Sequence, residues 1–533
     1  MADLVLRGAT VIDGTGAPGA RADVALDGGR IAAIGPGLTG RRVLDADGLA
    51  LCPGFIDMHA HSDLALLAEP AHAAKTTQGV TCEVLGQDGL SYAPVDDVTL
   101  EQTRQAIAGW NGDPPGFSWS WRGVGEYLDR LDTGIAVNAC YLVPQGSVRM
   151  LAMGWEPRPA NADDINRQRA LVAEAMEQGA VGMSSGLTYA PGMYASDDEL
   201  VELCRVVAGY GGYYSPHHRS YGAGALTAYA EMIEVSRRAG CPLHLAHATM
   251  NFPENAGRAP ELLKLLDHAI ADGCDISLDT YPYLPGSTTL VALVPSWASA
   301  GGPEVIVRRL RDQGALLRMR RDLEQLGSDG CHGVPADWRT VEISGSRDPR
   351  AVGRTIADLA AEQGRPPFEV FRTLLLDDDL GTTILHHVGN EENVRTIMGH
   401  PAHTGGSDGI LGPARPHPRA WGTFPRFLGR YVRDEGVLGL EECVAHLTGR
   451  AARRLRLSDR GLIRTGYHAD LVLFDPATVR DTATFEDPCR QADGIPYVFV
   501  NGVAVVDGGR PTGALPGHAL RRGAATGPVS RRS

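Results

Sequence analysis

Apolar runs alternate with amphipathic helical patterns through the middle of the chain, which is typical of repeated βα units around a parallel sheet. Helices fit between the runs; Asp197 to Glu199, for example, open a pattern in which Leu200, Leu203 and Val207 share one face. The candidate strands are 54–61, 79–86, 135–144, 180–187, 211–218, 241–248, 274–283 and 403–409. Eight strands close a TIM (β/α)8 barrel, so the pattern predicts an α/β barrel.

Both ends of the chain have a different pattern, in which short alternating runs are separated by glycine turns. Residues 1–53 contain several such runs, and similar text returns at 466–476 and 497–513 with the hairpin turns Asn501-Gly502 and Asp507-Gly508. We therefore expect one small β-sandwich built from 1–53 and 456–517. Residues 518–533 are rich in Gly, Ser and Arg and are expected to form a flexible tail.

The interval before the last candidate strand is too long for a simple crossover. Residues 284–402 carry helical patterns of their own and a strand-like TVEISG. Insertions of this size usually cover the C-terminal mouth of a barrel. We therefore expect a barrel domain at 54–455 with a lid at 284–402.

Composition and charge exclude several classes of function. The 533 residues carry 64 acidic and 50 basic side chains, a formal charge of -14, which argues against nucleic-acid partners and anionic membrane surfaces. No apolar run approaches the roughly 18 residues of a membrane span, and the start of the chain lacks a secretory pattern. The 9 scattered cysteines lack a Cys-x-x-Cys pair and indicate buried thiols in a reducing compartment. These features predict a cytoplasmic protein and give no indication of its oligomeric state.

Metal-ligating side chains stand where several of the candidate strands end. The first run ends with His59 and His61, two residues apart, so both imidazoles point to the same side of a strand. His-x-His alone is a weak signal, but further residues of this kind follow other runs: Asp88, His217, His218, His244, His247 and Asp408. Because the carboxyl ends of barrel strands meet at one face, and buried charges need partners, the set predicts a metal centre there.

The order of these residues resembles the amidohydrolase superfamily of metal-dependent barrels. The longer motifs look like those of the N-acyl-D-amino-acid deacylases (D-aminoacylases) over nearly the whole chain: GAVGMSSGLTYAPGMYASDDEL, YYSPHHR, DTYPYLPGST, SDGILGPARPHPRAWGTFPRFLGRYVRDEG and GLIRTGYHADLVLFDP. The resemblance implies one or two zinc ions. Asp88, His217 and His247 would hold the tighter metal, and a second position would be formed by His59, His61 and Asp408.

The resemblance also implies the chemistry and the substrate. Asp408 would act as general base and then general acid in hydrolysis of a small-molecule amide, namely an N-acyl amino acid of D configuration or a related amide. Tyr189, Ser287 and Arg419 would line the substrate pocket, with Arg419 a candidate clamp for a substrate carboxylate. His218, from the same motif as His217, and His244 are expected to support the site rather than bind metal.

Two positions depart from the family pattern. The family has cysteine where this chain has Asp88, and a carboxylate is a harder ligand, so divalent metals other than zinc are possible; alternatively Asp88 is not a ligand. The family also has a lysine, which helps to hold the substrate carboxylate, where this chain has Thr249. The predicted metal centre is therefore retained while the substrate pocket differs.

Three other functions compete with this interpretation. A hydantoinase- or dihydroorotase-like hydrolase of cyclic amides or imides typically needs a bridging lysine on strand four, but the only lysines are Lys75 and Lys264, in predicted helices. A deaminase needs a His-x-x-Glu pattern after strand five, which is not found. A non-catalytic metal-binding scaffold has no physical need for the full ligand set.

Overall fold

The computed structural model describes residues 1–522 and is organised around an 8-stranded parallel sheet curved into a barrel. The strands follow one another in chain order around the barrel. They are β6 (Phe55–Asp57), β7 (Val80–Leu85), β8 (Asn138–Pro144), β9 (Gly182–Gly186), β10 (Tyr213–His217), β11 (Leu243–Leu245), β12 (Ile276–Thr280) and β16 (His403–Gly405). Each falls inside one of the apolar runs, so the predicted barrel is confirmed.

The barrel closes between its first and last strands through backbone hydrogen bonds just beyond the strand ends. Met58 N donates to Gly405 O (3.1 Å), Asp408 N to His59 O (2.8 Å) and His61 N to Gly409 O (3.2 Å). We expected both histidines within the first strand, but β6 ends at Asp57 because the following residues bond to this closing segment instead. The seam between first and last strands therefore carries candidate ligands on both sides.

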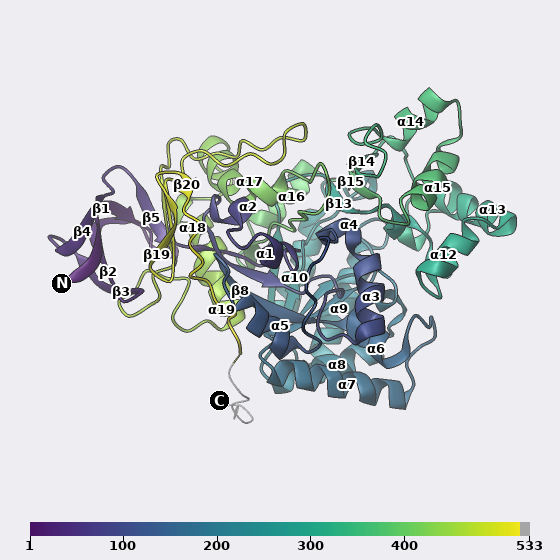
Figure 1. The fold of residues 1–533 in the computed structure, drawn as a ribbon, viewed down its shortest axis with the longest axis horizontal. Coiled ribbons are helices and arrows are strands. Elements are labelled where there is room, and N and C mark those ends of the chain that lie inside the picture. Colours follow the sequence, from purple (N-terminus) through teal and green to yellow (C-terminus); the bar gives the residue numbers. More distant parts are fainter. Residues whose placement is uncertain (523–533) are drawn as a thin grey trace.

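Helices surround the barrel, and the longer ones pack along its outer face (Figure 1). They are α1 (Ala65–Ala68), α2 (Ala73–Thr76), α3 (Asp97–Ala106), α4 (Ala108–Asn111), α5 (Val124–Leu131), α6 (Gln145–Met153), α7 (Ala162–Glu177), α8 (Asp197–Gly209), α9 (Ala225–Ala239), α10 (Ala259–Ala271), α16 (Glu391–Met398), α17 (Arg419–Arg426), α18 (Leu440–Ala445) and α19 (Ala451–Leu455). Helix α8 begins after the Ser196 cap and buries Leu200, Leu203 and Val207, as its pattern predicts. Within residues 1–522, no helix combines the length and apolar character needed to cross a membrane.

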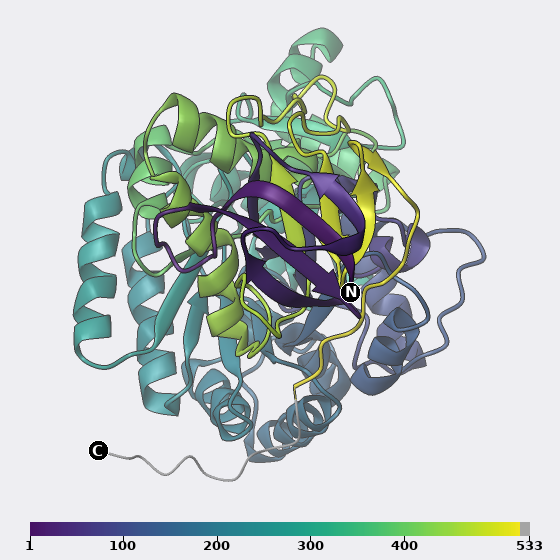
Figure 2. The same cartoon turned by 90° about the vertical axis from the view of Figure 1, so that its left-hand side faces the viewer.

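A 9-stranded sheet joins the two ends of the chain beside the barrel. Its strands are β1 (Ala2–Val11), β2 (Ala20–Asp27), β3 (Arg30–Gly35), β4 (Gly40–Asp45), β5 (Ala50–Pro53), β17 (Leu471–Phe474), β18 (Tyr497–Val500), β19 (Val503–Asp507) and β20 (Arg510–Pro511). The two halves meet where β5 pairs with β17, with Leu51 opposite Leu473. In Figure 2 the purple N-terminal strands and the yellow C-terminal strands accordingly lie together.

The insertion before β16 has its own small sheet and apolar core. It contains β13 (Gly286–Thr289), β14 (Val341–Gly345), β15 (Thr383–His386), α11 (Ser296–Ser299), α12 (Pro303–Arg309), α13 (Gln313–Arg321), α14 (Ile356–Gln363) and α15 (Pro367–Asp377). It projects from one end of the molecule in Figure 1. Helix α16, within the predicted lid, instead packs against α10 and the barrel strands, so the lid segment ends before Glu391.

The expected flexible tail does not begin at residue 518. His518 O accepts a hydrogen bond from Ala139 N (3.0 Å), Leu520 N donates to Ala139 O (2.7 Å), and Arg522 N donates to Gly179 O (3.0 Å). These bonds tie 518–522 to β8 and its neighbourhood, because β8 offers free backbone groups to a passing segment. The rest of the predicted tail, 523–533, lies outside the described residues.

A buried lysine holds the seam of the barrel together. Lys75 Nζ is 2.6 Å from Asp57 Oδ2, 2.8 Å from Glu83 Oε1 and 2.8 Å from Ser407 Oγ, and the ion-paired side chains are fully buried. Burial disfavours the ammonium, but the two carboxylates raise the pKa of Lys75 above its usual value. The other oxygen of Asp57 accepts from Ser407 N (2.8 Å) and His59 N (3.2 Å). One cation thus connects the first, second and last strands.

Replacing this lysine should destabilise the whole barrel. Lys75→Met leaves two buried carboxylates without their cation, so we expect the free energy of unfolding to fall by about 3–5 kcal/mol in urea titrations. Lys264→Met is the matched control, since Lys264 is exposed on α10, and we expect a change within about 0.5 kcal/mol. Equal effects of the two substitutions would contradict the assigned role of Lys75.

Candidate metal centre

The six ligands implied by the sequence converge at the C-terminal mouth of the barrel. They form two groups that share Asp88, and within each group one ligand atom per residue lies within 4.8 Å of the others. The groups are His59, His61, Asp88 and Asp408, and Asp88, His217 and His247. All six side chains are buried. The structure therefore brings together every residue that the resemblance assigned to the metals.

Asp88 lies at the centre of this cluster rather than at one side of it. Its Oδ1 is 3.5 Å from both His59 Nε2 and His247 Nε2. Its Oδ2 is 3.5 Å from His61 Nε2 and 3.4 Å from His217 Nδ1. Each oxygen thus faces both groups, and the alternative that Asp88 stands away from the site disagrees with this geometry.

The cluster has the chemistry of a cation site. Within residues 1–522, both ring nitrogens of His59 and Oδ1 of Asp88 are buried without a hydrogen-bond partner, although buried polar atoms are usually paired. Burial opposes protonation of His61, yet Asp408 and Asp88 raise its pKa to about 10. A field that draws a proton so strongly also favours a divalent cation. The residues present therefore fit zinc, which accepts imidazole nitrogen and carboxylate oxygen.

Three of the ligand positions have an unusual backbone. Asp88, His247 and Asp408 have φ values of 54°, 32° and 48°, in the left-handed region that non-glycine residues rarely adopt. Such conformations cost on the order of 1–3 kcal/mol each and cluster at functional sites. They turn the chain directly after a strand, which aims each side chain across the mouth of the barrel.

A surrounding layer of hydrogen bonds orients the imidazoles. His217 Nε2 is 2.7 Å from Thr188 Oγ1, and His247 Nδ1 is 3.0 Å from Tyr221 Oη. Asp279 on β12 accepts from His247 N (3.0 Å) and contacts His244 Nε2 (3.0 Å). Such partners fix the ring orientation and the tautomer of metal-binding histidines.

The two histidines expected to support the site do not reach the cluster centre. His244 contacts Asp279 instead, and His218 stacks against Tyr221 with ring centroids 4.0 Å apart. Burial and the neighbouring His217 lower the pKa of His218 well below its usual value, so its ring is neutral. The choice of His217 over His218 therefore agrees with the geometry.

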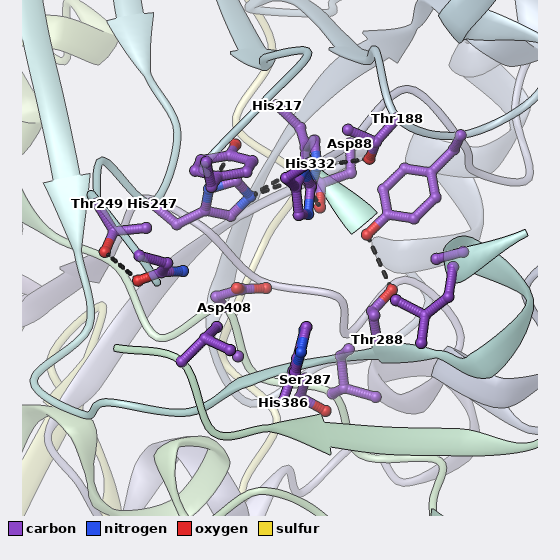
Figure 3. A pocket seen from close by; sticks show the side chains of 18 of the residues that line it. Asp88, Thr188, His217, His247, Thr249, Ser287, Thr288, His332, His386 and Asp408 are labelled. Carbon is purple, nitrogen blue, oxygen red and sulfur yellow. Dashed lines mark hydrogen bonds and ion pairs between the residues drawn. The ribbon is translucent and has the colours of Figure 1, made fainter. Parts of the chain in front are cut away.

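A cavity of ≈ 90 Å³ opens above the cluster and is covered by the insertion. Tyr189 and Ser287 line it, as the resemblance implied, and Thr249 lies on its wall. Figure 3 shows His217, His247, Asp88 and Asp408 around one space, with residues of the insertion facing them. The labelled residues of the insertion are Ser287, Thr288, His332 and His386.

Arg419 lies behind this cavity and not in its lining, which corrects one expectation. Its side chain is fully buried, and its Nη2 is 2.9 Å from Asp408 Oδ2. The guanidinium also lies over the ring of Tyr281, 4.4 Å from the centroid. Burial opposes ionisation of Asp408, but Arg419 and His59 hold its pKa well below the usual range. Pairing with the buried carboxylate of Asp408 places the Arg419 side chain outside the cavity lining.

Several lining residues were missed by the sequence analysis. Tyr281 lies within the motif DTYPY and Tyr221 lies two residues after PHHR, so these motifs could have indicated them. Trp110 lies on the short helix α4 in the connection after β7, His332 lies in the insertion, and no local pattern marks either residue. Burial and nearby histidines lower the pKa of His332 to about 3, so it is neutral.

Removing the central carboxylate should empty both positions. Loss of a group supporting a metal ligand typically lowers affinity 10–100-fold, and Asp88→Asn removes the shared ligand itself, so we expect zinc affinity to fall by more than about 100-fold. Zinc content after dialysis, by mass spectrometry, measures this. Asp63→Asn is the control, because Asp63 is a buried carboxyl bonded to Ser91 Oγ (2.6 Å) and Gly86 N (2.9 Å) outside the cluster. Full zinc content in Asp88→Asn would remove Asp88 from the site.

Comparison with known proteins agrees with this geometry. The sequence pattern of the Amidohydrolase family matches residues 42–506. D-aminoacylase of Alcaligenes xylosoxydans xylosoxydans is 36% identical over 98% of both chains. N-acyl-D-glutamate deacylase from the same organism is also 36% identical, over 98% of this chain and 97% of its own.

A solved structure shows the same fold with metal bound. N-acyl-D-glutamate deacylase of Bordetella bronchiseptica, in complex with zinc and a phosphonate inhibitor that mimics the tetrahedral intermediate, superposes with a TM-score of 0.84. It is 34% identical over 98% of this chain and 99% of its own. This chain therefore belongs to the amidohydrolase family and, within it, to the N-acyl-D-amino-acid deacylases.

Proposed function

We propose that this protein is a zinc-dependent hydrolase that cleaves the amide bond of N-acyl-D-amino acids. The observation that carries the proposal is a six-residue ligand set that includes a buried acid, Asp408, facing the substrate cavity. The names of the related deacylases support an N-acyl-D-amino acid as substrate. Hydrolysis releases a carboxylic acid and the free amino acid.

The ligand assignment follows the two groups of the cluster. Asp88, His217 and His247 would hold one ion, and a second position would be formed by His59, His61 and Asp408. A bound zinc ion supplies Lewis acidity for the amide carbonyl and lowers the pKa of bound water. Because Asp88 offers oxygen in place of sulfur, other divalent metals that favour oxygen can replace zinc.

Asp408 moves the proton in this proposal. It accepts a proton from the attacking water and returns it to the leaving amine nitrogen. Its Oδ1 lies 3.2 Å from His61 Nε2, while Oδ2 is paired with Arg419. Arg419 therefore keeps the carboxylate ionised and holds Oδ2, while Oδ1 faces the candidate ligands.

One end of the cavity is suited to the carboxylate of the substrate. Within the described residues, Ser287 Oγ and the Nη1 and Nε atoms of Arg419 are buried without hydrogen-bond partners, and Arg419 Nη2 contacts Ser287 O at 3.4 Å. Unpaired buried donors next to a cavity favour an anionic group there. We therefore place the carboxylate of the amino acid beside Ser287 and Tyr281.

The cysteines give no sign that the protein folds in an oxidising compartment. All nine cysteines are free thiols, and of these only Cys489 is exposed. We infer a cytoplasmic location from this, since secreted chains of comparable cysteine content usually form disulfides.

Asp408→Asn should abolish turnover while leaving substrate binding. We expect kcat on N-acetyl-D-amino acids to fall by about 10²–10⁴-fold, since the amide neither accepts nor returns the proton. Asp267→Asn, an exposed acid on α10, should keep full activity. Zinc content is measured alongside, so that loss of metal is separated from loss of the proton carrier. Zinc-loaded wild-type protein that cleaves no N-acyl-D-amino acid, N-acyl-L-amino acid or cyclic imide would refute the proposed function.

Thr249→Lys should tighten binding of substrates with a free carboxylate. Among the described residues that line the cavity there is no lysine or arginine, and Thr249 Oγ1 donates only to Asn251 Oδ1 (2.8 Å). A new ammonium should lower KM about tenfold, about 1.4 kcal/mol, for N-acetyl-D-amino acids. It should leave KM for their carboxamide analogues unchanged. Thr249→Met is the neutral control, and an equal gain in that variant would show that charge is not the cause.

A further inference from the structure

A second cavity of ≈ 70 Å³ adjoins the substrate cavity. The two share Trp110, Thr188, Tyr189 and Ala292 in their linings, so these residues form the wall between them. The second cavity extends beneath the start of the insertion, between α3 and α12. Neither the proposed reaction nor the assigned ligands use this space.

The second cavity is built to hold an uncharged, apolar group. No charged side chain occurs among the described residues that line it. Its apolar lining comes from the barrel and from the insertion: Leu90, Trp155, Val291, Val294, Ile306 and Leu380. A carboxylate placed there would lose its hydration without gaining a partner.

The dividing wall stands directly beside the candidate metal centre. The ring of Trp110 lies 5.0 Å from that of His61 and 5.1 Å from that of Tyr189, and Tyr189 lies 4.9 Å from His217. Tyr189 Oη is held by Thr288 Oγ1 at 2.9 Å. In contrast, Trp110 Nε1 is buried without a hydrogen-bond partner in the described part of the chain. The indole is therefore held by packing, and turning it would break no hydrogen bond among the described residues.

The two ends of the substrate can be assigned from these surroundings. Ser287, whose buried Oγ has no hydrogen-bond partner among the described residues, lines the substrate cavity and is absent from the lining of the second cavity, so it marks the carboxylate end. The scissile carbonyl must lie at the ligand cluster, next to Trp110 and Tyr189. The group on the far side of that carbonyl from the amino acid is the acyl chain, which then points towards the wall.

We propose that the second cavity receives the acyl chain of the substrate, so that the protein favours linear acyl groups longer than acetyl. This inference rests on the proposed deacylase function and specifies its substrate class. The volume corresponds to about two or three water-sized groups, hence about two or three further carbons. Each buried methylene contributes about 0.8 kcal/mol, which is about fourfold in kcat/KM.

The test measures kcat/KM for a series of N-acyl-D-amino acids. The amino acid is the same throughout, and the linear acyl chain lengthens from acetyl to decanoyl. We expect kcat/KM to rise about fourfold per carbon for the first two or three carbons beyond acetyl and then to stop rising. Val291→Phe, which fills the cavity, should lower the pentanoyl-to-acetyl ratio of kcat/KM by about tenfold or more. Val307→Phe is the matched control, because Val307 is an equally half-buried valine of the insertion outside the cavity lining, and it should keep the wild-type ratio.

Three outcomes would overturn the assignment. Acetyl as the best acyl group in the wild type would show that the cavity is not used. An unchanged pentanoyl-to-acetyl ratio in Val291→Phe would show that any chain preference arises elsewhere. The third outcome comes from a matched series of N-acetyl substrates whose amino-acid side chains lengthen. If Val291→Phe lowered kcat/KM only in this series, the cavity would be assigned to the amino-acid side chain. In each case hydrolysis persists and the proposed function stands, whereas hydrolysis of none of the substrates would refute both.

Discussion

The salt bridge between Lys75 and Asp57 determines where the reacting groups of this protein stand. A barrel must close between its first and last strands, and here the closing segments also carry His59 and Asp408. Asp57 accepts hydrogen bonds from the backbone on both sides of the seam, and Lys75 fixes Asp57 from below. The closure of the fold and the spacing of the candidate ligands therefore depend on one ion pair, because neither side of the seam can shift without the other.

Buried carboxylates are also paired with cations around the mouth of the barrel. Lys75 neutralises carboxylates beneath the ligands, and Arg419 pairs with Asp408 behind them. Among the described residues, the ion-pair partners of Asp88 are four histidines. Burial opposes its ionisation, while His59, His217 and His247 hold its pKa well below the usual range. A buried carboxylate needs a cation beside it, so this arrangement favours positive charge at one point, between the two ligand groups. The apolar walls formed by Trp110 and Tyr189 then strengthen every electrostatic interaction inside the cavity.

The sequence predicted the barrel and its ligands because both leave local signals. Each strand is an apolar run, and a polar residue at the carboxyl end of such a run must lie at the mouth whatever the rest of the chain does. The position of Arg419 had no such signal, since its burial results from pairing with Asp408 across the seam. Trp110 and His332 were missed for a related reason: they lie in long connections, Trp110 between β7 and β8 and His332 in the insertion, and only the folded structure shows that both reach the cavity. The resemblance supplied the roles that spacing alone left open.

The aspartate at position 88, where the family resemblance implies a cysteine, affects more than ligand hardness. A thiolate has one sulfur atom, whereas the carboxylate of Asp88 presents two oxygens, and each of them approaches one histidine from either ligand group. Asp88 would therefore be shared between the two ligand groups. The positive φ of Asp88 is compatible with this role, because aspartate adopts the left-handed region more readily than most residues. The geometry of this chain thus places one carboxylate between the two ligand groups, where it would contribute to both.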